Sequence, residues 1–134
     1  MSKPPVIAIV DDDEAVREAL FDLLQVEGLS ACIFESATAF FAHAAHSDFD
    51  CLITDVRMPE IDGLELQRRL RICGSSMPVI FVTSSTDDAT RARASLDGAT
   101  AWFNKPVADE ALLRELRAAL DRRDTATGTY VFGS

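Results

Sequence analysis

The amino-acid sequence predicts a single α/β domain, in which five helices cover both faces of a doubly wound sheet of five parallel strands. Short, continuous apolar runs alternate along the chain with longer segments whose apolar residues recur at helical spacing. Strands that are apolar throughout are buried on both faces, which is typical of a parallel sheet covered by helices. The length of 134 residues suits one such domain.

The five predicted strands are short runs rich in β-branched and aromatic residues, and turn residues or acids bound them. The run that Pro78 introduces has the strongest strand character. Right-handed crossovers between the strands leave only a few doubly wound strand orders. In chain order the predicted strands are Val6–Val10, Ser30–Phe34, Cys51–Thr54, Val79–Thr83 and Thr100–Phe103.

A helix is predicted after each strand, from the spacing of apolar residues and from residues that start or stop helices. Gly28 can end the first helix, Ser36 can cap the second, and Asp97 with Gly98 can close the fourth. The fourth helix has the weakest apolar face, so we expect it to pack lightly. The apolar positions of the five helices are Val16, Ala19, Leu20, Leu23 and Leu24; Phe40, Phe41 and Ala44; Leu66, Leu70 and Cys73; Ala89, Ala92 and Leu96; and Leu112, Leu113, Leu116, Ala119 and Leu120.

The end of the chain differs from the rest. After Arg123 the apolar periodicity stops, and Thr, Gly and Ser become frequent. Segments of this composition form flexible ends or linkers. We therefore predict a domain over residues 1–123, followed by a flexible tail or the start of a linker over residues 124–134.

The composition argues against several functions. A formal net charge of -9 disfavours binding to nucleic acids or anionic membranes, because Lys and Arg bind their phosphates. No apolar run approaches the roughly 20 residues that cross a bilayer, and the N-terminus does not resemble a signal peptide. The cysteines Cys32, Cys51 and Cys73 are too few and too widely spaced for a disulfide framework or a zinc site. We expect a cytoplasmic protein whose thiols are buried.

Polar residues cluster where the predicted strands end. The carboxyl ends of parallel strands meet at one edge of the sheet, where ligands bind in doubly wound folds. Several carboxylates, a hydroxyl and an ammonium group are therefore expected in one cleft. These residues are Asp11, Asp12 and Asp13 after the first strand, Asp55 after the third, Thr83 and Ser84 at the end of the fourth, and Asn104, Lys105 and Pro106 after the fifth.

This combination favours phosphoryl transfer. Clustered carboxylates bind Mg²⁺ through oxygen, and a carboxylate can itself attack phosphorus to form an aspartyl-phosphate. A metal ion and a lysine stabilise the charge of the transferred group. Taken singly, each residue has a simpler interpretation: Asp12 and Asp13 could cap a helix, Thr83 could be an ordinary strand residue, and Lys105 a loop cation. The convergence of four strand ends favours the site.

On these residues the chain resembles the receiver domain of two-component response regulators. The matching segments are IVDDDEAVR at 9–17, LITDVRMPEIDGLEL at 52–66, VIFVTSS at 79–85 and WFNKPV at 102–107. The combination of VDDDE with DVRMP looks most like the FixJ-like subfamily. The resemblance implies a flavodoxin-like sheet of order 2-1-3-4-5.

The resemblance also implies a role for each site residue. Asp55 would be the phosphoacceptor and a ligand of Mg²⁺, with Mn²⁺ as an alternative. Asp12 would bind the ion directly, Asp11 through a water molecule, and Arg57 through its backbone carbonyl. Thr83 and Lys105 would contact oxygens of the phosphoryl group, which makes them, with Asp55, the catalytic residues.

Further positions concern the switch. Thr83 and Trp102 occupy the positions of the family's switch pair, although Trp102 could instead be a partly buried aromatic that only packs on the last strand. Pro106 would follow a cis peptide bond. The small Ser84 would leave the phosphate accessible. Phosphorylation would change the surface of the fourth helix, fifth strand and fifth helix.

The resemblance implies a signalling domain, not an enzyme, beyond phosphorylating itself from a phosphodonor and slowly dephosphorylating itself. Its partners would be a sensor histidine kinase, a second copy bound through the fourth helix and fifth strand when phosphorylated, and an output domain or protein outside these residues. We expect no direct contact with nucleic acid or membrane. The chain would be a stand-alone receiver or the N-terminal part of a longer regulator.

Two other functions fit parts of the sequence. A receiver fold could serve as an interaction module that phosphorylation does not control. A haloacid-dehalogenase-like phosphatase also begins with acids after its first strand. The phosphatase pattern, however, leaves the segment from Asp55 to Pro59 unexplained.

Overall fold

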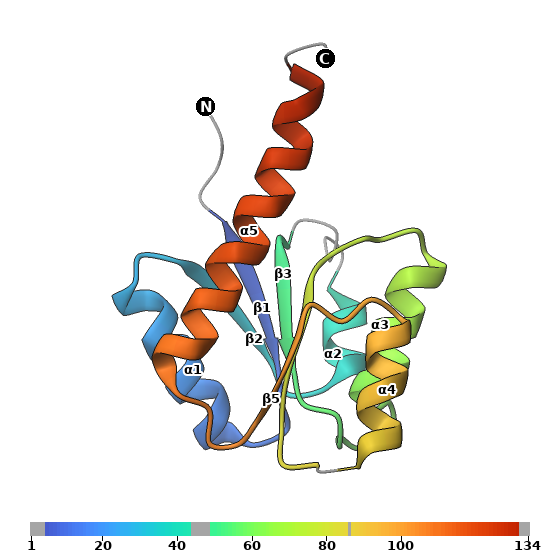
Figure 1. Ribbon diagram of the computed structural model, residues 1–134. Coiled ribbons are helices and arrows are strands. Elements are labelled where there is room, and N and C mark those ends of the chain that lie inside the picture. The colour runs from blue at the N-terminus through green and yellow to red at the C-terminus, as the bar shows by residue number, and fades with distance from the viewer. Residues whose placement is uncertain (1–4, 44–48, 86, 132–134) are drawn as a thin grey trace.

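The computed structural model describes residues 5–43, 49–85 and 87–131. Its centre is one sheet of five parallel strands in the order β2-β1-β3-β4-β5 (Figure 1). This order confirms the predicted fold class, and four of the five strands begin and end where the sequence predicts. The strands are β1 (Val6–Val10), β2 (Ser30–Phe34), β3 (Cys51–Thr54), β4 (Val79–Thr83) and β5 (Ala101–Asn104), the last shifted by one residue from its predicted bounds.

The helices cover both faces of the sheet, as the apolar strands require. Helices α1 and α5 lie on one face, and α2, α3 and α4 lie on the other (Figure 1). Side chains alternate along a strand. Ile7 and Ile9 of β1 therefore pack against α1 and α5, whereas Ala8 and Val10 pack on the face covered by α2, α3 and α4. The helices are α1 (Glu14–Val26), α2 (Ala37–Ala42), α3 (Gly63–Ile72), α4 (Asp88–Leu96) and α5 (Asp109–Val131).

Side-chain caps fix the start of the first four helices. The side chains of Asp13, Ser36, Asp62 and Asp87 each accept hydrogen bonds from the backbone amides of the first helical turn. Ser36 is the cap predicted for α2, and Gly28 ends α1 in the left-handed conformation that favours glycine. Ala44, predicted on α2, lies outside the described residues. These caps place the helix starts next to the carboxyl edge of the sheet.

Helix α4 packs lightly, as predicted, but with a different face. Its expected apolar positions Ala89, Ala92 and Leu96 are exposed, and Leu96 is 85% exposed. Ala94 is instead the one buried residue of this helix. Alanine-rich segments give a weak periodic signal, so the sequence could not fix which face meets the core.

The expectation that the thiols are buried is wrong for two of the three cysteines. Cys73 is exposed at the end of α3, Cys32 is half-buried, and only Cys51 is buried. The backbone of α5 continues to Val131, beyond the predicted end of the domain at Arg123. An established helix adds residues at little cost, and the last turns of α5 project beyond the sheet (Figure 1). Residues 132–134 of the predicted tail lie outside the described part of the chain.

Candidate functional site

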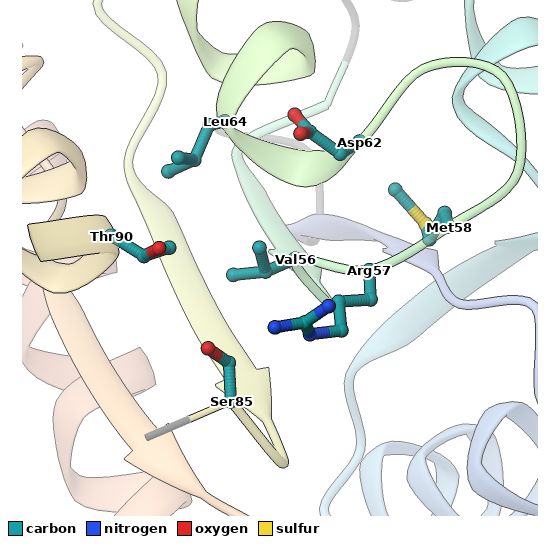
Figure 2. Close-up of a pocket in the computed structure, with 7 residues that line it drawn as sticks. All are labelled: Val56, Arg57, Met58, Asp62, Leu64, Ser85 and Thr90. Carbon is teal, nitrogen blue, oxygen red and sulfur yellow. The ribbon is translucent and has the colours of Figure 1, made fainter. Parts of the chain in front are cut away.

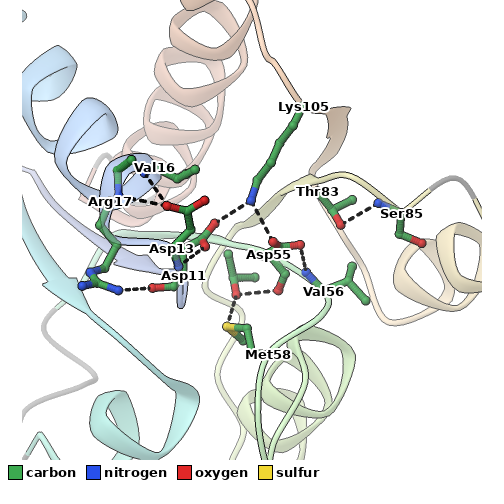
Figure 3. A network of polar contacts seen from close by, with 12 residues as sticks. Asp11, Asp13, Val16, Arg17, Asp55, Val56, Met58, Thr83, Ser85 and Lys105 are labelled. Carbon is green, nitrogen blue, oxygen red and sulfur yellow. Dashed lines mark hydrogen bonds and ion pairs between the residues drawn. The ribbon is translucent and has the colours of Figure 1, made fainter.

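Four strands bring the predicted polar side chains to one edge of the sheet. Asp11 follows β1, Asp55 follows β3, Thr83 ends β4, and Lys105 follows β5 (Figure 3). The Lys105 ammonium lies between the two carboxylates, with Nζ 3.0 Å from Asp11 Oδ2 and 2.8 Å from Asp55 Oδ2. Lys105 therefore contacts both Asp11 and Asp55, although the three residues lie far apart in the sequence.

The Asp55 carboxylate is held in one orientation. Asp55 is 6% exposed as a residue, and its Oδ1 atom accepts a 2.6 Å hydrogen bond from the Val56 amide while Oδ2 faces Lys105. The loop behind it is tight: a Cβ atom on Gly63 would lie 2.1 Å from the Asp55 carbonyl oxygen. Only glycine therefore lets the start of α3 approach Asp55 this closely.

Three carboxylates gather around this point. Side-chain oxygens of Asp11, Asp12 and Asp55 all lie within 4.8 Å of one another. Asp11 and Asp55 are buried, whereas Asp12 is exposed. Hard oxygen ligands of this kind fit Mg²⁺, which prefers carboxylates and retains part of its water shell. The acidic cluster is thus a chemically suitable site for a divalent cation.

The electrostatics of the cluster reflect burial. Burial raises the pKa of Asp11, although hydrogen bonds from the Asp13 amide and from Lys105 oppose the shift. Burial alone would lower the pKa of Lys105, but its hydrogen bonds with Asp55 and Asp11 outweigh that effect and raise it. Lys105 is therefore a firmly protonated cation, while burial makes the negative charge of Asp11 costly even with the Lys105 ammonium beside it.

The neighbouring residues position the loop after β1. The Arg17 guanidinium donates a 2.7 Å hydrogen bond to the Asp11 carbonyl oxygen, and the Asp13 amide donates to Asp11 Oδ1 at 2.9 Å. The Asp13 carboxylate turns away to cap α1, where it accepts from the Ala15 amide. Of the three consecutive acids, Asp11 and Asp12 therefore join the acidic cluster with Asp55, whereas the Asp13 carboxylate caps α1.

The end of β4 leads directly into α4. Thr83 is buried, and its hydroxyl accepts a 3.1 Å hydrogen bond from the Ser85 amide. The Ser85 carbonyl oxygen accepts a 2.9 Å hydrogen bond from the Asn104 side chain, while Ser84 is exposed. The roles of Ser85 and of the Val56 amide were not foreseen, because a backbone donor leaves no signal in the sequence.

The remaining predicted residues surround this centre. The Trp102 ring is partly buried and packs on Phe81, with ring centroids 5.5 Å apart. The Lys105–Pro106 peptide bond is cis. The Arg57 side chain is exposed and lines an open pocket of about 350 Å³ beside Asp55, which Figure 2 shows between the loop after β3 and the start of α4. Its lining residues are Val56, Arg57, Met58, Asp62, Leu64, Ser85 and Thr90.

A five-stranded parallel sheet of this order, with acids and a lysine at its carboxyl edge, defines an α/β domain of the CheY-like class. Residues 7–117 match the family model described as the response regulator receiver domain, and the chain belongs to this family. Receiver domains of response regulators are phosphorylated by sensor histidine kinases and act in two-component signalling.

Named relatives agree with the FixJ-like assignment. The response regulator protein TodT of Pseudomonas putida is 45% identical over 115 residues, which cover 86% of this chain and 51% of TodT. The transcriptional regulatory protein FixJ of Azorhizobium caulinodans is 40% identical over 116 residues, covering 87% of this chain and 55% of FixJ. The chain thus spans about half the length of these relatives.

Solved structures extend the agreement to the fold. The structure of the response regulator StyR superposes with a TM-score of 0.85 at 34% identity, and the match covers 96% of this chain and 66% of StyR. Among the described residues, no helix combines the length and apolar character needed to cross a membrane.

Proposed function

We propose that this domain is a phosphorylation-controlled switch, in which Asp55 accepts a phosphoryl group from a phosphohistidine of a partner sensor kinase. An Asp55 carboxylate oxygen would attack phosphorus as the phosphorus–nitrogen bond breaks, and the histidine would leave with a proton. The observation that carries the proposal is the setting of Asp55, a buried carboxylate 2.8 Å from Lys105 and close to Asp11 and Asp12.

The surrounding groups have complementary roles in this proposal. Lys105 is positioned to bind an oxygen of the transferred group, and the Val56 amide already holds one Asp55 oxygen. Mg²⁺, held by Asp11, Asp12, Asp55 and the Arg57 carbonyl, would neutralise charge on the transferring phosphoryl group when bound. Mn²⁺ offers the same ligand preference. Asp13 has no part in this chemistry, because its carboxylate caps α1.

Thr83 would carry the phosphorylation signal outward. Its hydroxyl lies at the same edge as Asp55 and bonds to the Ser85 amide. A phosphoryl group on Asp55 would attract the Thr83 hydroxyl and loosen that bond, so the connection between β4 and α4 would shift. With Trp102 on the neighbouring strand, the surface of α4, β5 and α5 would then change.

Several partners follow from this proposal. The changed surface would pair two copies through α4 and β5, or bind an output domain or protein outside these residues. Because the chain spans about half the length of TodT and FixJ, residues 124–134 are proposed to lead toward such an output domain. The net charge of -9 supports the proposal that these residues do not contact nucleic acid directly.

The test is phosphorylation by a small phosphodonor such as acetyl phosphate, with Mg²⁺ present. We expect wild-type protein to be labelled and Asp55→Asn to be unlabelled, although the variant retains the fold. Unchanged labelling of Asp55→Asn would contradict the proposal. A receiver fold that serves only as an interaction module would take no label in either form.

A further inference from the structure

Helix α4 is attached very unevenly along its length. Its first residues Asp88 and Ala89 are exposed, and Thr90 borders the open pocket of about 350 Å³ (Figure 2). Only Ala94, in the second half of the helix, is buried. The beginning of α4 therefore has few packing contacts and free space beside it, which is the condition for local movement.

The C-terminal end of α4 is capped by backbone hydrogen bonds. Gly98 adopts a positive φ of 86°, and its amide donates to the Ser95 carbonyl while the Ala99 amide donates to the Ala94 carbonyl. This pair of hydrogen bonds satisfies carbonyls that a helix end otherwise leaves open. The last turn of α4 is therefore a well-defined structure.

Two side chains of α3 add a second set of bonds to this end. The Gln67 amide group donates a 3.2 Å hydrogen bond to the Ala94 carbonyl, and Arg71 Nε donates a 2.9 Å hydrogen bond to the Asp97 carbonyl. Residues four apart lie on one face of a helix. The face of α3 that meets α4 thus holds the last turn of α4 through polar contacts.

Arg71 connects this turn to a second part of the fold. Its Nη1 atom also donates to the carbonyls of Ser75 and Met77, at 3.1 and 2.9 Å, in the loop that leads into β4. Burial lowers the pKa of Arg71, and Asp97 partly opposes that shift. One guanidinium therefore fastens the end of α4 to the segment that enters the central sheet.

Gln67 is an unusual choice for this interface. It is fully buried, and no protein atom of the described chain donates a hydrogen bond to its Oε1 atom. A leucine would fill similar space without leaving a carbonyl unpaired, and such unpaired groups cost free energy. The feature that distinguishes Gln67 from a leucine at this position is therefore its NH₂ group, which donates a hydrogen bond to the Ala94 carbonyl.

A series of hydrogen bonds connects Thr83, at the proposed phosphorylation site, with the first turn of α4. The Ser85 amide donates to the Thr83 hydroxyl, the Asp87 amide donates to the Ser85 hydroxyl at 3.4 Å, and Asp87 caps α4. A displacement of Thr83 would therefore act first on the beginning of the helix. The end of the helix is tied to different groups.

We propose that α4 moves as a lever, with its pivot at the last turn, where Gln67 and Arg71 of α3 hold it, and with its first turns swinging beside the pocket. This inference rests on the proposed function, because phosphorylation of Asp55 supplies the displacement. Gln67 is a positioning residue: it keeps the pivot in place and confines the movement to the end of α4 that faces the site.

The test is amide hydrogen exchange by NMR on the wild-type chain, with Mg²⁺ and with or without beryllofluoride as a phosphoryl mimic. We expect the exchange rates of Arg91, Ala92 and Arg93 to change by about tenfold or more, and those of Gly98 and Ala99 by less than about twofold. Equal changes at both ends of α4 would overturn the lever. If beryllofluoride changes the exchange rates of Thr83 and Ser85 and changes both ends of α4 equally, the proposed function stands and only the lever is overturned. If no exchange rate changes, the lever and the proposed function are both overturned.

The role of Gln67 is tested by Gln67→Leu, with Arg68→Leu as a matched control at the exposed neighbouring position. In Gln67→Leu we expect beryllofluoride to change the exchange rates of Gly98 and Ala99 by about fivefold or more, because the hydrogen bond from position 67 to the Ala94 carbonyl is lost. Arg68→Leu should keep the wild-type pattern. A wild-type pattern in Gln67→Leu would overturn the role of Gln67, and the wild-type comparison stands even where a variant fails to fold.

Discussion

The polar edge of the sheet and helix α4 lie side by side but are built in opposite ways. At the edge, Asp55 is fixed by the Val56 amide, by Lys105 and by the close approach of Gly63. Helix α4 buries a single residue and borders an open pocket. Phosphoryl transfer requires reactive groups held in place, whereas a switch requires an element that moves at small cost. The difference suggests that the two tasks are divided between these regions.

The largest effect is expected from a change in the proposed metal site, which lies at the polar edge of the sheet. Asp12→Ala deletes an exposed carboxylate of the acidic cluster and should abolish Mg²⁺-dependent phosphorylation. Asp13→Ala is the matched control, because Asp13 caps α1 and should affect only stability, by about 1 kcal/mol. Phosphodonor labelling and chemical denaturation measure the two effects. Equal losses of labelling in both variants would contradict the division of roles among the acids.

The next prediction concerns the loop between Asp55 and Gly63, which holds Asp55 in place. In Gly63→Ala the new methyl group would meet the Asp55 carbonyl, which lies 2.1 Å from the ideal Cβ position. The backbone must shift, and we expect a loss of about 1–3 kcal/mol in the free energy of unfolding together with slower labelling of Asp55. Gly74→Ala offers a comparison, since its Cβ would meet no atom within 4 Å, although its positive φ still disfavours alanine. Labelling at the wild-type rate in Gly63→Ala would show that the loop position is unimportant.

A pair of leucines compares the packing of the two regions. Leu70 of α3 is fully buried, whereas Leu96 of α4 is 85% exposed. We expect Leu70→Ala to lower the free energy of unfolding by about 2–5 kcal/mol, and Leu96→Ala to change it by less than about 0.5 kcal/mol. Urea denaturation measures both. A large loss for Leu96→Ala would mean that α4 is anchored more firmly than its burial indicates.

A smaller effect concerns the charge of Asp11 when no metal is added. Because burial raises the folded-state pKa of Asp11 above 3.8, its contribution to stability is fully present below pH 3.8 and is lost as the pH rises through the folded pKa. Asp11→Asn should therefore raise the melting temperature at pH 7 in EDTA, and should remove most of the stabilisation that Mg²⁺ gives the wild type. A lower melting temperature for the variant in EDTA would contradict this sign.

The sequence predicted the residues at the polar edge of the sheet better than it predicted the packing of α4. Strand ends are marked by abrupt changes from apolar to acidic residues, so Asp11, Asp55, Thr83 and Lys105 could be placed together from topology alone. The face of α4 could not be placed, because alanine and threonine give almost no periodic signal and Ala94 differs little from Ala92 in sequence. Gln67 could not be foreseen as a buried residue, since its polar side chain argues for exposure.

The ends of the helices show a second limit. Cys73 continues the spacing of Leu66 and Leu70, but α3 ends at Ile72 and the thiol is exposed. The backbone of α5 continues to Val131 without the apolar spacing that marks its first turns. Apolar spacing reports packing against a core and not the point at which backbone hydrogen bonding stops.

The central claim is that Asp55 accepts the phosphoryl group in a reaction that depends on the acidic cluster. The most direct measurement is mass spectrometry of peptides from protein treated with acetyl phosphate, in Mg²⁺ and in EDTA. We predict one phosphoryl group, on the peptide containing Asp55, in Mg²⁺ and almost none in EDTA. A phosphoryl group on a different residue, or equal modification of Asp55 in EDTA, would contradict the account.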